Sequence, residues 1–232
     1  KVKLDALIQM HCWDGQWFIW AIGEDGTVYG CRAQEEGTIY LNTQVWAVMS
    51  GAASPDQAHS ALNAVDQKLS TDYGLMLAAP PFAKMPIDVM RAVLFVPGIK
   101  ENSGIFNHTQ GWGVIAETMV GNGDRAYRYY KAFLPASQND FASIREVEPY
   151  VHAQSTHSLY SEKYGRSRLS WLTGAATWSH VAGTQYILGI RPEEDGLRID
   201  PCIPKDWPGF LVIRTFRGAR YEIEVSNPNG KN

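Results

Sequence analysis

Residues 100–134 read KENSGIFNHTQGWGVIAETMVGNGDRAYRYYKAFL, and this stretch does most to decide the fold. A loop of charged and amide residues comes first, and residues 110–120 then carry apolar side chains at helical spacing. Gly123-Asp124 begins a second helix that runs from Arg125 to Leu134. The stretch therefore predicts two consecutive helices joined by a short turn, with a polar loop in front of the first helix.

The helical pattern continues on both sides of this stretch. Residues 41–49 are apolar and helical, and Ser54 followed by Pro55 is typical of an N-cap and first helical position. Residues 171–188 predict the longest apolar helix, which ends at Gly189. Paired helices with long irregular loops fit an α/α toroid, in which the loops form the active site, and fit an ordinary helical bundle equally well.

Two other segments predict β structure. The turn dipeptides Asp14-Gly15 and Asp25-Gly26 bracket an apolar run, which predicts a β-hairpin at about residues 14–30. From Gly196 onward, short alternating or β-branched segments are separated by Pro and Gly. The end of the chain is therefore expected to form a small antiparallel β unit.

Composition excludes several classes of protein. The 232 residues include 21 Lys and Arg against 24 Asp and Glu, a net charge of −3, without the basic excess typical of nucleic-acid-binding proteins. No apolar run approaches the roughly 20 residues of a membrane helix, and the first residues do not resemble a signal peptide. Cys12, Cys31 and Cys202 are too scattered for a disulfide framework or zinc site and favour a reducing, cytoplasmic compartment.

The chain contains eight tryptophans, an abundance that suits either of two roles. Indole faces stack on sugar rings, and they also simply fill cores. The sequence contains no P-loop, dinucleotide fingerprint, HExxH or paired CxxC, so no local motif indicates a site for a metal or an organic cofactor.

Two polar clusters could bind an anion. His108 and Thr109 stand at a predicted helix start, where an imidazole and free backbone N–H groups can hold an oxyanion such as phosphate. Thr173 and Gly174 lie near the start of the other apolar helix and offer a hydroxyl and a closely approachable amide. Each cluster can equally be a helix cap, with His108 as a structural histidine.

A third polar segment, residues 148–154, is predicted to be extended. It ends in Gln154, whose amide could hydrogen-bond sugar hydroxyls.

Taken in order, several motifs resemble the C-terminal part of glycoside hydrolase family 94, the disaccharide phosphorylases. This family includes the cellobiose, cellodextrin, laminaribiose, cellobionic acid and chitobiose phosphorylases. Each motif is weak alone, but the combination is specific and extends over essentially the whole chain. The motifs are KENSGIFNH (100–108), GNGDRAY (121–127), EPYV (148–151), WLTG (171–174), QYILG (185–189), GLRIDPCIP (196–204) and FRGA (216–219).

The resemblance implies a mainly α fold, part of an (α/α)6 toroid followed by a C-terminal antiparallel β-sandwich. Residues 1–190 would form the C-terminal half of the toroid and residues 191–232 part of the sandwich. It also implies a homodimer that needs no cofactor. The implied reaction is inverting phosphorolysis of a cellobiose-like or cellodextrin-like β-glucoside, which yields α-glucose 1-phosphate and a shortened sugar.

The resemblance also implies roles for individual residues. His108, Thr173 and Gly174 match the phosphate-binding positions. Phe95 matches a position that is aromatic in glucose-specific members and smaller in chitobiose phosphorylase, which favours plain glucosides. The remaining sugar-binding candidates are Lys100, Glu101 and Gln154.

A phosphorylase uses phosphate as its nucleophile, so it needs a general acid but no carboxylate base. The family's acid is an Asp in a Gly-Asp-Trp-Asn-Asp-like segment that this sequence lacks. We expect that segment upstream, since the chain has no initiator Met and opens on what resembles the end of a helix. Asp14 and Glu101 are alternative acids that we do not favour, because Asp14 belongs to a predicted turn. The family usually has Arg where this chain has Trp20, which leaves the sugar contacts of the hairpin open.

Two other functions remain open at this point. One is a hydrolase of the same fold that uses water in place of phosphate. The other is a carbohydrate-binding piece without catalytic activity, since the acid is missing from these residues.

Overall fold

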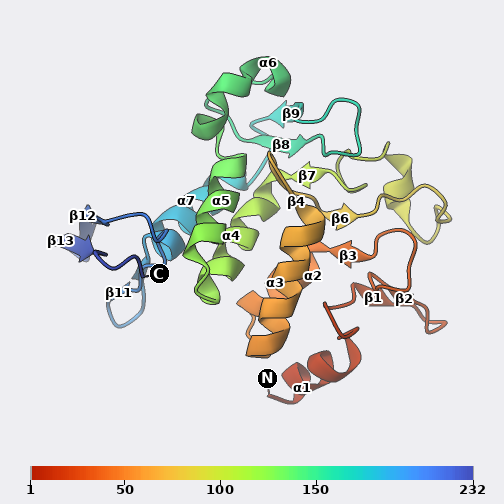
Figure 1. Ribbon diagram of the computed structural model, residues 1–232, viewed down its shortest axis with the longest axis horizontal. Helices are drawn as coiled ribbons and strands as arrows, with labels where there is room; N and C mark the ends of the chain where they lie inside the picture. Colours follow the sequence, from red (N-terminus) through yellow and green to blue (C-terminus); the bar gives the residue numbers. More distant parts are fainter. Residues whose placement is uncertain (1, 232) are drawn as a thin grey trace.

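Helices occupy the centre of the molecule, and β-hairpins flank them on both sides (Figure 1). The structure is a computed structural model that describes residues 2–231. The central helices are α2 (Leu41–Met49), α3 (Pro55–Leu69), α4 (Gln110–Met119), α5 (Gly123–Phe133) and α7 (Ala175–Val181), and α7 continues into the π-helical turn η4 (Ala182–Ile187). The shorter helical segments are α1 (Val2–His11), η1 (Arg91–Leu94), η2 (Asn107–Thr109), η3 (Pro135–Phe141) and α6 (Ala142–Arg145).

The sequence explains how α3 begins. Ser54 Oγ accepts a hydrogen bond from the Gln57 N–H at 3.3 Å, while Gln57 Oε1 accepts one from the Ser54 N–H at 3.1 Å. This is a complete capping box, and it confirms the predicted N-cap at Ser54 and Pro55 in the first helical position. Leu62 and Val65 then turn a fully buried face toward the core.

Close packing of α4 against α7 positions the later site. A Cβ added to Gly111 would lie only 2.8 Å from the backbone oxygen of Trp178, so the two helices approach more closely there than any larger residue would permit. The turn before α4 is consequently held against the start of α7.

All the strands are short and antiparallel. The three-stranded sheet is β7 (Ile105–Phe106), β8 (Ala153–Thr156) and β9 (Ser167–Ser170), with β8 in the middle. The other strands form pairs: β1 (Ala21–Ile22) with β2 (Val28–Tyr29), β3 (Ile39–Tyr40) with β6 (Ala78–Ala79), β4 (Ser70–Thr71) with β5 (Gly74–Leu75), β10 (Ile190–Pro192) with β11 (Leu197–Ile199), and β12 (Gly209–Phe216) with β13 (Ala219–Ser226).

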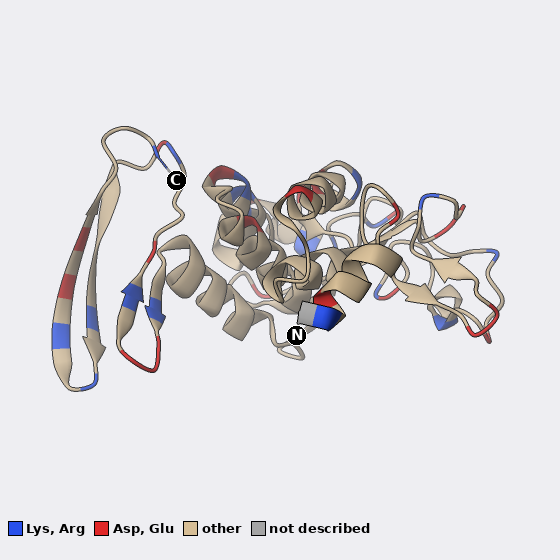
Figure 2. Ribbon diagram, turned by 90° about the horizontal axis from the view of Figure 1, so that it is seen from below, with Lys and Arg blue, Asp and Glu red and all other residues tan. Residues whose placement is uncertain are grey.

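Several predictions are confirmed and two need correction. The hairpin near residues 14–30 is present as β1 and β2, and the chain after Gly189 forms two antiparallel pairs, of which β12–β13 extends away from the helices (Figure 2). The description "mainly α" holds only in part, because the strands make the chain a mixture of helix and sheet. The helix predicted from Trp171 begins at Ala175, because residues 167–170 pair as β9 and Trp171 adopts a left-handed φ of 68°.

The toroid, the sandwich and the boundary between residues 1–190 and 191–232 stay predictions. No helix within residues 2–231 has the length and apolar character needed to cross a membrane. The three cysteines are free thiols.

Candidate functional site

The residues predicted to bind phosphate come from two elements that meet in space. His108 lies in η2, immediately before α4, and Gly174 immediately precedes α7, which packs against η2. A Cβ placed on Gly174 would lie 3.9 Å from the Cβ of His108. The neighbouring Thr173 Oγ1 accepts a hydrogen bond from the Ala175 N–H at 3.1 Å, which leaves its own hydroxyl proton available to donate. The fold thus brings together His108, Thr173 and Gly174 from segments 65 residues apart (173 − 108).

Two aromatic rings hold the His108 imidazole. Phe106 and Trp112 approach it edge to face, with ring centroids at 5.2 and 5.0 Å. Burial lowers the pKa of His108 below its ordinary value of 6.5, so the ring is neutral at pH 7 and carries one N–H donor. Trp112 also contacts Trp178 at 5.7 Å, so these two tryptophans serve the packing of α4 and α7.

The predicted sugar-binding loop brings Phe95 and Lys100 together. The Lys100 ammonium lies 5.4 Å from the centroid of the Phe95 ring. The Gly104 N–H donates to the Lys100 carbonyl at 3.0 Å, which turns the chain tightly around Lys100. Glu101 is exposed beside it. Three of the predicted residues therefore share one surface loop.

Gln154 lies on β8, the central strand of the three-stranded sheet. Its Oε1 is buried and has no hydrogen-bond partner within the described chain, so it is an acceptor that a sugar hydroxyl could satisfy. The neighbouring Ala153 carbonyl accepts a hydrogen bond from Asn107 Nδ2 at 2.9 Å. This bond joins β8 to η2, one residue from Gln154 and one residue from His108.

Strand β7 connects the sugar loop to the phosphate residues. It follows the loop and leads directly into η2, and its Phe106 pairs with Ser155 of β8. Residues 95–108, Gln154 and residues 173–174 therefore belong to one continuous region, which we call the loop site.

Two features of the loop site were not predicted from the sequence. The first is Asn102, which is fully buried and hydrogen-bonds to two backbone segments. The second is backbone strain in the loop site and in the adjoining residues 169–171, since four non-glycine residues have left-handed φ angles, and such residues tend to cluster at functional sites. They are Lys100 (49°), Ser103 (61°), Leu169 (59°) and Trp171 (68°).

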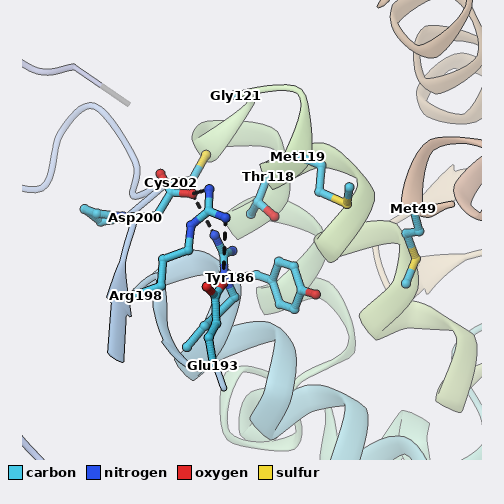
Figure 3. A pocket seen from close by; sticks show the side chains of 11 residues that line it. Met49, Thr118, Met119, Gly121, Tyr186, Glu193, Arg198, Asp200 and Cys202 are labelled. Carbon is cyan, nitrogen blue, oxygen red and sulfur yellow. Dashed lines mark hydrogen bonds and ion pairs between the residues drawn. The ribbon is translucent and has the colours of Figure 1, made fainter. Parts of the chain in front are cut away.

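A separate cavity of about 650 Å³ lies at the other end of α4 (Figure 3). Its charged groups come mainly from β10, β11 and the turn between them, and they satisfy one another. Asp200 accepts from Arg191 at 2.6 Å and from Arg198 at 3.0 Å. Since each guanidinium has a counter-charge, none of the described residues that line the cavity offers a free cation for phosphate, and none of them is a predicted site residue.

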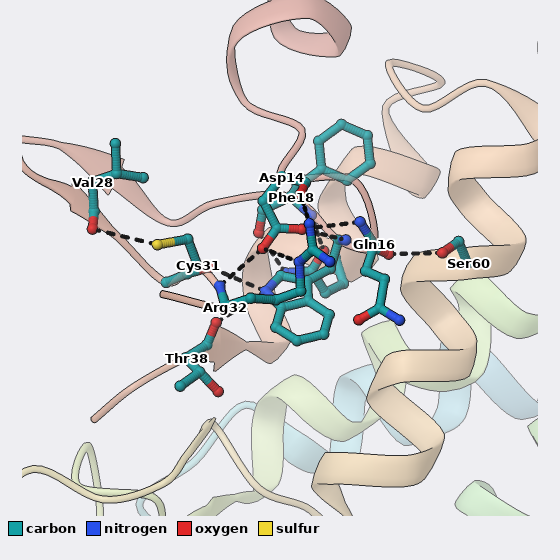
Figure 4. A network of polar contacts seen from close by, with 11 residues as sticks. Asp14, Gln16, Phe18, Val28, Cys31, Arg32, Thr38 and Ser60 are labelled. Carbon is teal, nitrogen blue, oxygen red and sulfur yellow. Dashed lines mark hydrogen bonds and ion pairs between the residues drawn. The ribbon is translucent and has the colours of Figure 1, made fainter. Parts of the chain in front are cut away.

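Asp14 holds a turn and does not serve the loop site (Figure 4). Its Oδ1 accepts from the N–H groups of Gln16 and Trp17 at 3.0 and 3.1 Å, and its Oδ2 accepts from the Arg32 N–H at 2.9 Å. The Arg32 guanidinium also pairs with Oδ2 at 3.4 Å. A carboxylate engaged in this way is unsuited to deliver a proton to a substrate, which agrees with the expectation from the sequence.

Metal ligands do not gather at the loop site or elsewhere among residues 2–231, where no group of three or more His, Cys, Asp or Glu side chains converges. That the reaction needs no cofactor stays a prediction.

Comparison with known proteins identifies the family. The model of the glycosyl hydrolase 94 superfamily catalytic domain matches residues 2–189. The chain belongs to this family. It is 42% identical to N,N'-diacetylchitobiose phosphorylase of Vibrio proteolyticus, over 95% of this chain and 28% of that protein.

Other relatives are phosphorylases with different substrates in their names. Identity is 36% to solabiose phosphorylase of Paenibacillus borealis, over 98% of this chain and 30% of the relative. Identity is 32% to cellobionic acid phosphorylase of Neurospora crassa, over 98% of this chain and 29% of the relative. The chain thus spans less than a third of the length of these glycosyl hydrolase 94 relatives.

Proposed function

We propose that the full-length protein catalyses inverting phosphorolysis of a β-linked glucose disaccharide or oligosaccharide, with cellobiose or a cellodextrin as substrate. The proposal rests chiefly on one observation, the meeting of His108 with Gly174 across two distant segments. Motif resemblance assigns both residues to phosphate, and their proximity supports that assignment. Relatives named as phosphorylases add support.

In this reaction, the loop site holds phosphate in line with the anomeric carbon. The His108 N–H, the Thr173 hydroxyl and the Gly174 amide donate to phosphate oxygens, which replaces the carboxylate base of an inverting hydrolase. A phosphate oxygen forms a bond to the anomeric carbon as the glycosidic C–O bond breaks. The departing sugar oxygen takes a proton from a general acid, which we expect to be an Asp outside these residues.

Sugar recognition falls to the other half of the loop site. Lys100, Glu101 and the Gln154 amide oxygen are polar groups able to bond sugar hydroxyls. Phe95 sets which sugar fits, because its ring occupies a position that is smaller in chitobiose phosphorylase. A bulky ring beneath Lys100 favours glucose over a sugar with a 2-acetamido group.

A second candidate is phosphorolysis of N,N'-diacetylchitobiose. The observation in its favour is the 42% identity to the Vibrio proteolyticus enzyme of that name. The same assay separates the two, since each disaccharide gives a different sugar 1-phosphate.

The test is to incubate the full-length protein with cellobiose or N,N'-diacetylchitobiose, with and without inorganic phosphate. We expect α-glucose 1-phosphate to appear from cellobiose only when phosphate is present, with the anomer identified by NMR. Equal release of glucose without phosphate would indicate a hydrolase. Sugar binding without turnover would indicate a carbohydrate-binding protein, and a β-phosphate would exclude inversion.

The resemblance also suggests a homodimer. We propose that state for the full-length protein, to be checked by light scattering.

A further inference from the structure

Three buried amide side chains in this protein make the same set of hydrogen bonds. In each, the amide oxygen accepts the N–H of one distant residue, and the amide nitrogen donates to that residue's carbonyl and to a second carbonyl. Such an amide makes the two hydrogen bonds to one residue that a neighbouring β-strand would make, and we call the arrangement an amide clamp. The three amides are Gln44, Asn102 and Gln110, and each is at most 1% exposed.

Asn102 forms this amide clamp within the loop site. Its Oδ1 accepts from the Phe82 N–H at 2.7 Å, and its Nδ2 donates to the Phe82 carbonyl at 2.8 Å. The same Nδ2 donates to the carbonyl of Phe95 at 2.8 Å. One side chain therefore ties three segments together, including the segment that carries the proposed sugar-selecting ring.

The backbone around Asn102 closes the same loop a second time. The Gly98 N–H donates to the Asn102 carbonyl at 2.8 Å, so the main chain of Asn102 closes residues 98–102 within the larger ring of residues 95–102 that its side chain closes. Lys100 lies inside that ring in a left-handed conformation, with its ammonium over Phe95. The relative placement of Lys100 and Phe95 thus depends on Asn102, which contacts neither side chain in its hydrogen bonds.

We propose that Asn102 is a positioning residue that sets the sugar selectivity of the enzyme by fixing the main chain of Phe95 beneath Lys100. The inference rests on the proposed function, because Asn102 can affect sugar selectivity only if the loop site binds the sugar substrate. Asn102 touches no substrate atom. It acts through Phe95, and its loss lets the ring move away from the space that a 2-acetamido group would need.

Gln44 supplies a matched control. Its Oε1 accepts from the Phe18 N–H at 2.8 Å, and its Nε2 donates to the carbonyls of Phe18 at 2.8 Å and Tyr40 at 3.0 Å. This clamp is as buried as that of Asn102 and makes the same three bonds, but it joins α2 to the N-terminal hairpin and not to the loop site. A purely structural role predicts the same consequences for loss of either clamp.

The experiment uses the full-length protein and compares kcat/KM for cellobiose and N,N'-diacetylchitobiose. Asn102→Asp keeps the size of the side chain and the bond from Phe82 N–H, but it removes both donated bonds. We expect it to lower the preference for cellobiose by about tenfold or more, with the KM for phosphate within about twofold of wild type. Gln44→Glu, the matched change, should lower Tm by a similar amount and leave the preference unchanged.

Epistasis with Phe95 provides the sharper measurement. Phe95→Val alone should lower the cellobiose preference, and adding Asn102→Asp to it should change the preference no further, because the ring on which Asn102 acts is gone. Additive effects of the two substitutions would overturn the inference. So would an unchanged preference in Asn102→Asp. If Asn102→Asp does not fold, Asn102→Ser provides the same comparison with a smaller side chain.

Failure of the proposed function looks different. In that case the wild-type protein itself would show no phosphate-dependent turnover of either disaccharide. An active wild type whose preference is insensitive to Asn102 would instead reject the role of Asn102 alone.

Discussion

The turn at Asp14 and the loop site are both short polar segments, but their polar atoms are used in opposite ways. Around Asp14, each carboxylate oxygen accepts from backbone N–H groups, and Arg32 balances the charge. In the loop site, Gln154 Oε1, Ser103 Oγ and Asn107 Oδ1 are buried without a partner in the described part of the chain. The backbone of the loop site is also strained, whereas the turn places Gly15 where a φ of 99° is needed.

This difference distinguishes polar groups that stabilise the fold from polar groups that are available to a ligand. A polar group that is satisfied by its own chain stabilises the fold, because it gives up water without losing hydrogen bonds. A buried polar group without a partner in its own chain lowers stability unless a water molecule or a ligand supplies the missing hydrogen bond. We therefore expect substitutions in the turn to change stability, and substitutions in the loop site to change activity.

The largest expected effect is that of His108→Ala in the full-length protein. Loss of one donor to the reacting phosphate should lower kcat/KM for phosphate by roughly 100-fold or more. Tm should stay near that of wild type, since the half-buried ring makes no hydrogen bond in the described chain on which the fold depends. An unchanged KM and kcat for phosphate would remove His108 from the site.

Asp14→Ala should show the reverse behaviour. It removes the acceptor for three backbone N–H groups and the ion pair with Arg32, so the free energy of unfolding should fall by about 2 kcal/mol. Urea unfolding measures this loss. Phosphorolysis at a temperature well below Tm should be unchanged, and a large fall in kcat would instead point to Asp14 as a catalytic acid.

His152 should make the free energy of unfolding depend on pH. Burial, with a smaller contribution from Arg145, lowers the pKa of His152 to about 4. Because the unfolded chain binds this proton near pH 6.5, stability should fall as the pH drops from about 6.5 to 4, by on the order of 2 kcal/mol after allowance for solvent screening. His152→Leu should flatten that part of a plot of unfolding free energy against pH, and a plot identical to wild type would contradict the assignment.

Gly174→Ala is the mildest test. Its φ of −87° suits alanine, and the added methyl would find its nearest neighbours at 3.9 Å, so the fold should tolerate it. The methyl would point toward His108 and crowd the proposed phosphate position, which should raise the KM for phosphate by about tenfold, or 1.4 kcal/mol. Isothermal titration with phosphate provides the check, and Gly196→Ala, in open space on the β10–β11 turn, is a suitable control.

Local sequence patterns predicted the helices well, because helices depend on contacts between near neighbours. Ser54, Pro55 and Gln57 form a cap that can be identified from four residues alone. The turn dipeptides identified the hairpin of β1 and β2 for the same reason. The start of α7 was misplaced because Trp171 is apolar yet 69% exposed, and pattern analysis assumes that apolar residues are buried.

The loop site could be predicted only as a set of separate motifs. Motif resemblance assigned His108 and Gly174 to one function, but only the packing of α7 against η2 and α4 shows that these two residues lie close together. The sequence predicted an extended segment near β8 but not the sheet of β7, β8 and β9, because its strands are two to four residues long and β7 pairs with β8 across about 50 residues. Asn102 escaped as well, since a single amide in a loop forms no pattern.

The left-handed residues in the loop site and next to it have a consequence for engineering the protein. Lys100, Ser103, Leu169 and Trp171 each hold a conformation that costs on the order of 1–3 kcal/mol for a residue with a side chain. A search for heat-resistant variants would therefore favour glycine or asparagine at these positions. Such variants would unfold at a higher temperature, but their loops would lose the rigidity on which the proposed substrate recognition depends. Selection for thermal stability alone would therefore be expected to lower activity.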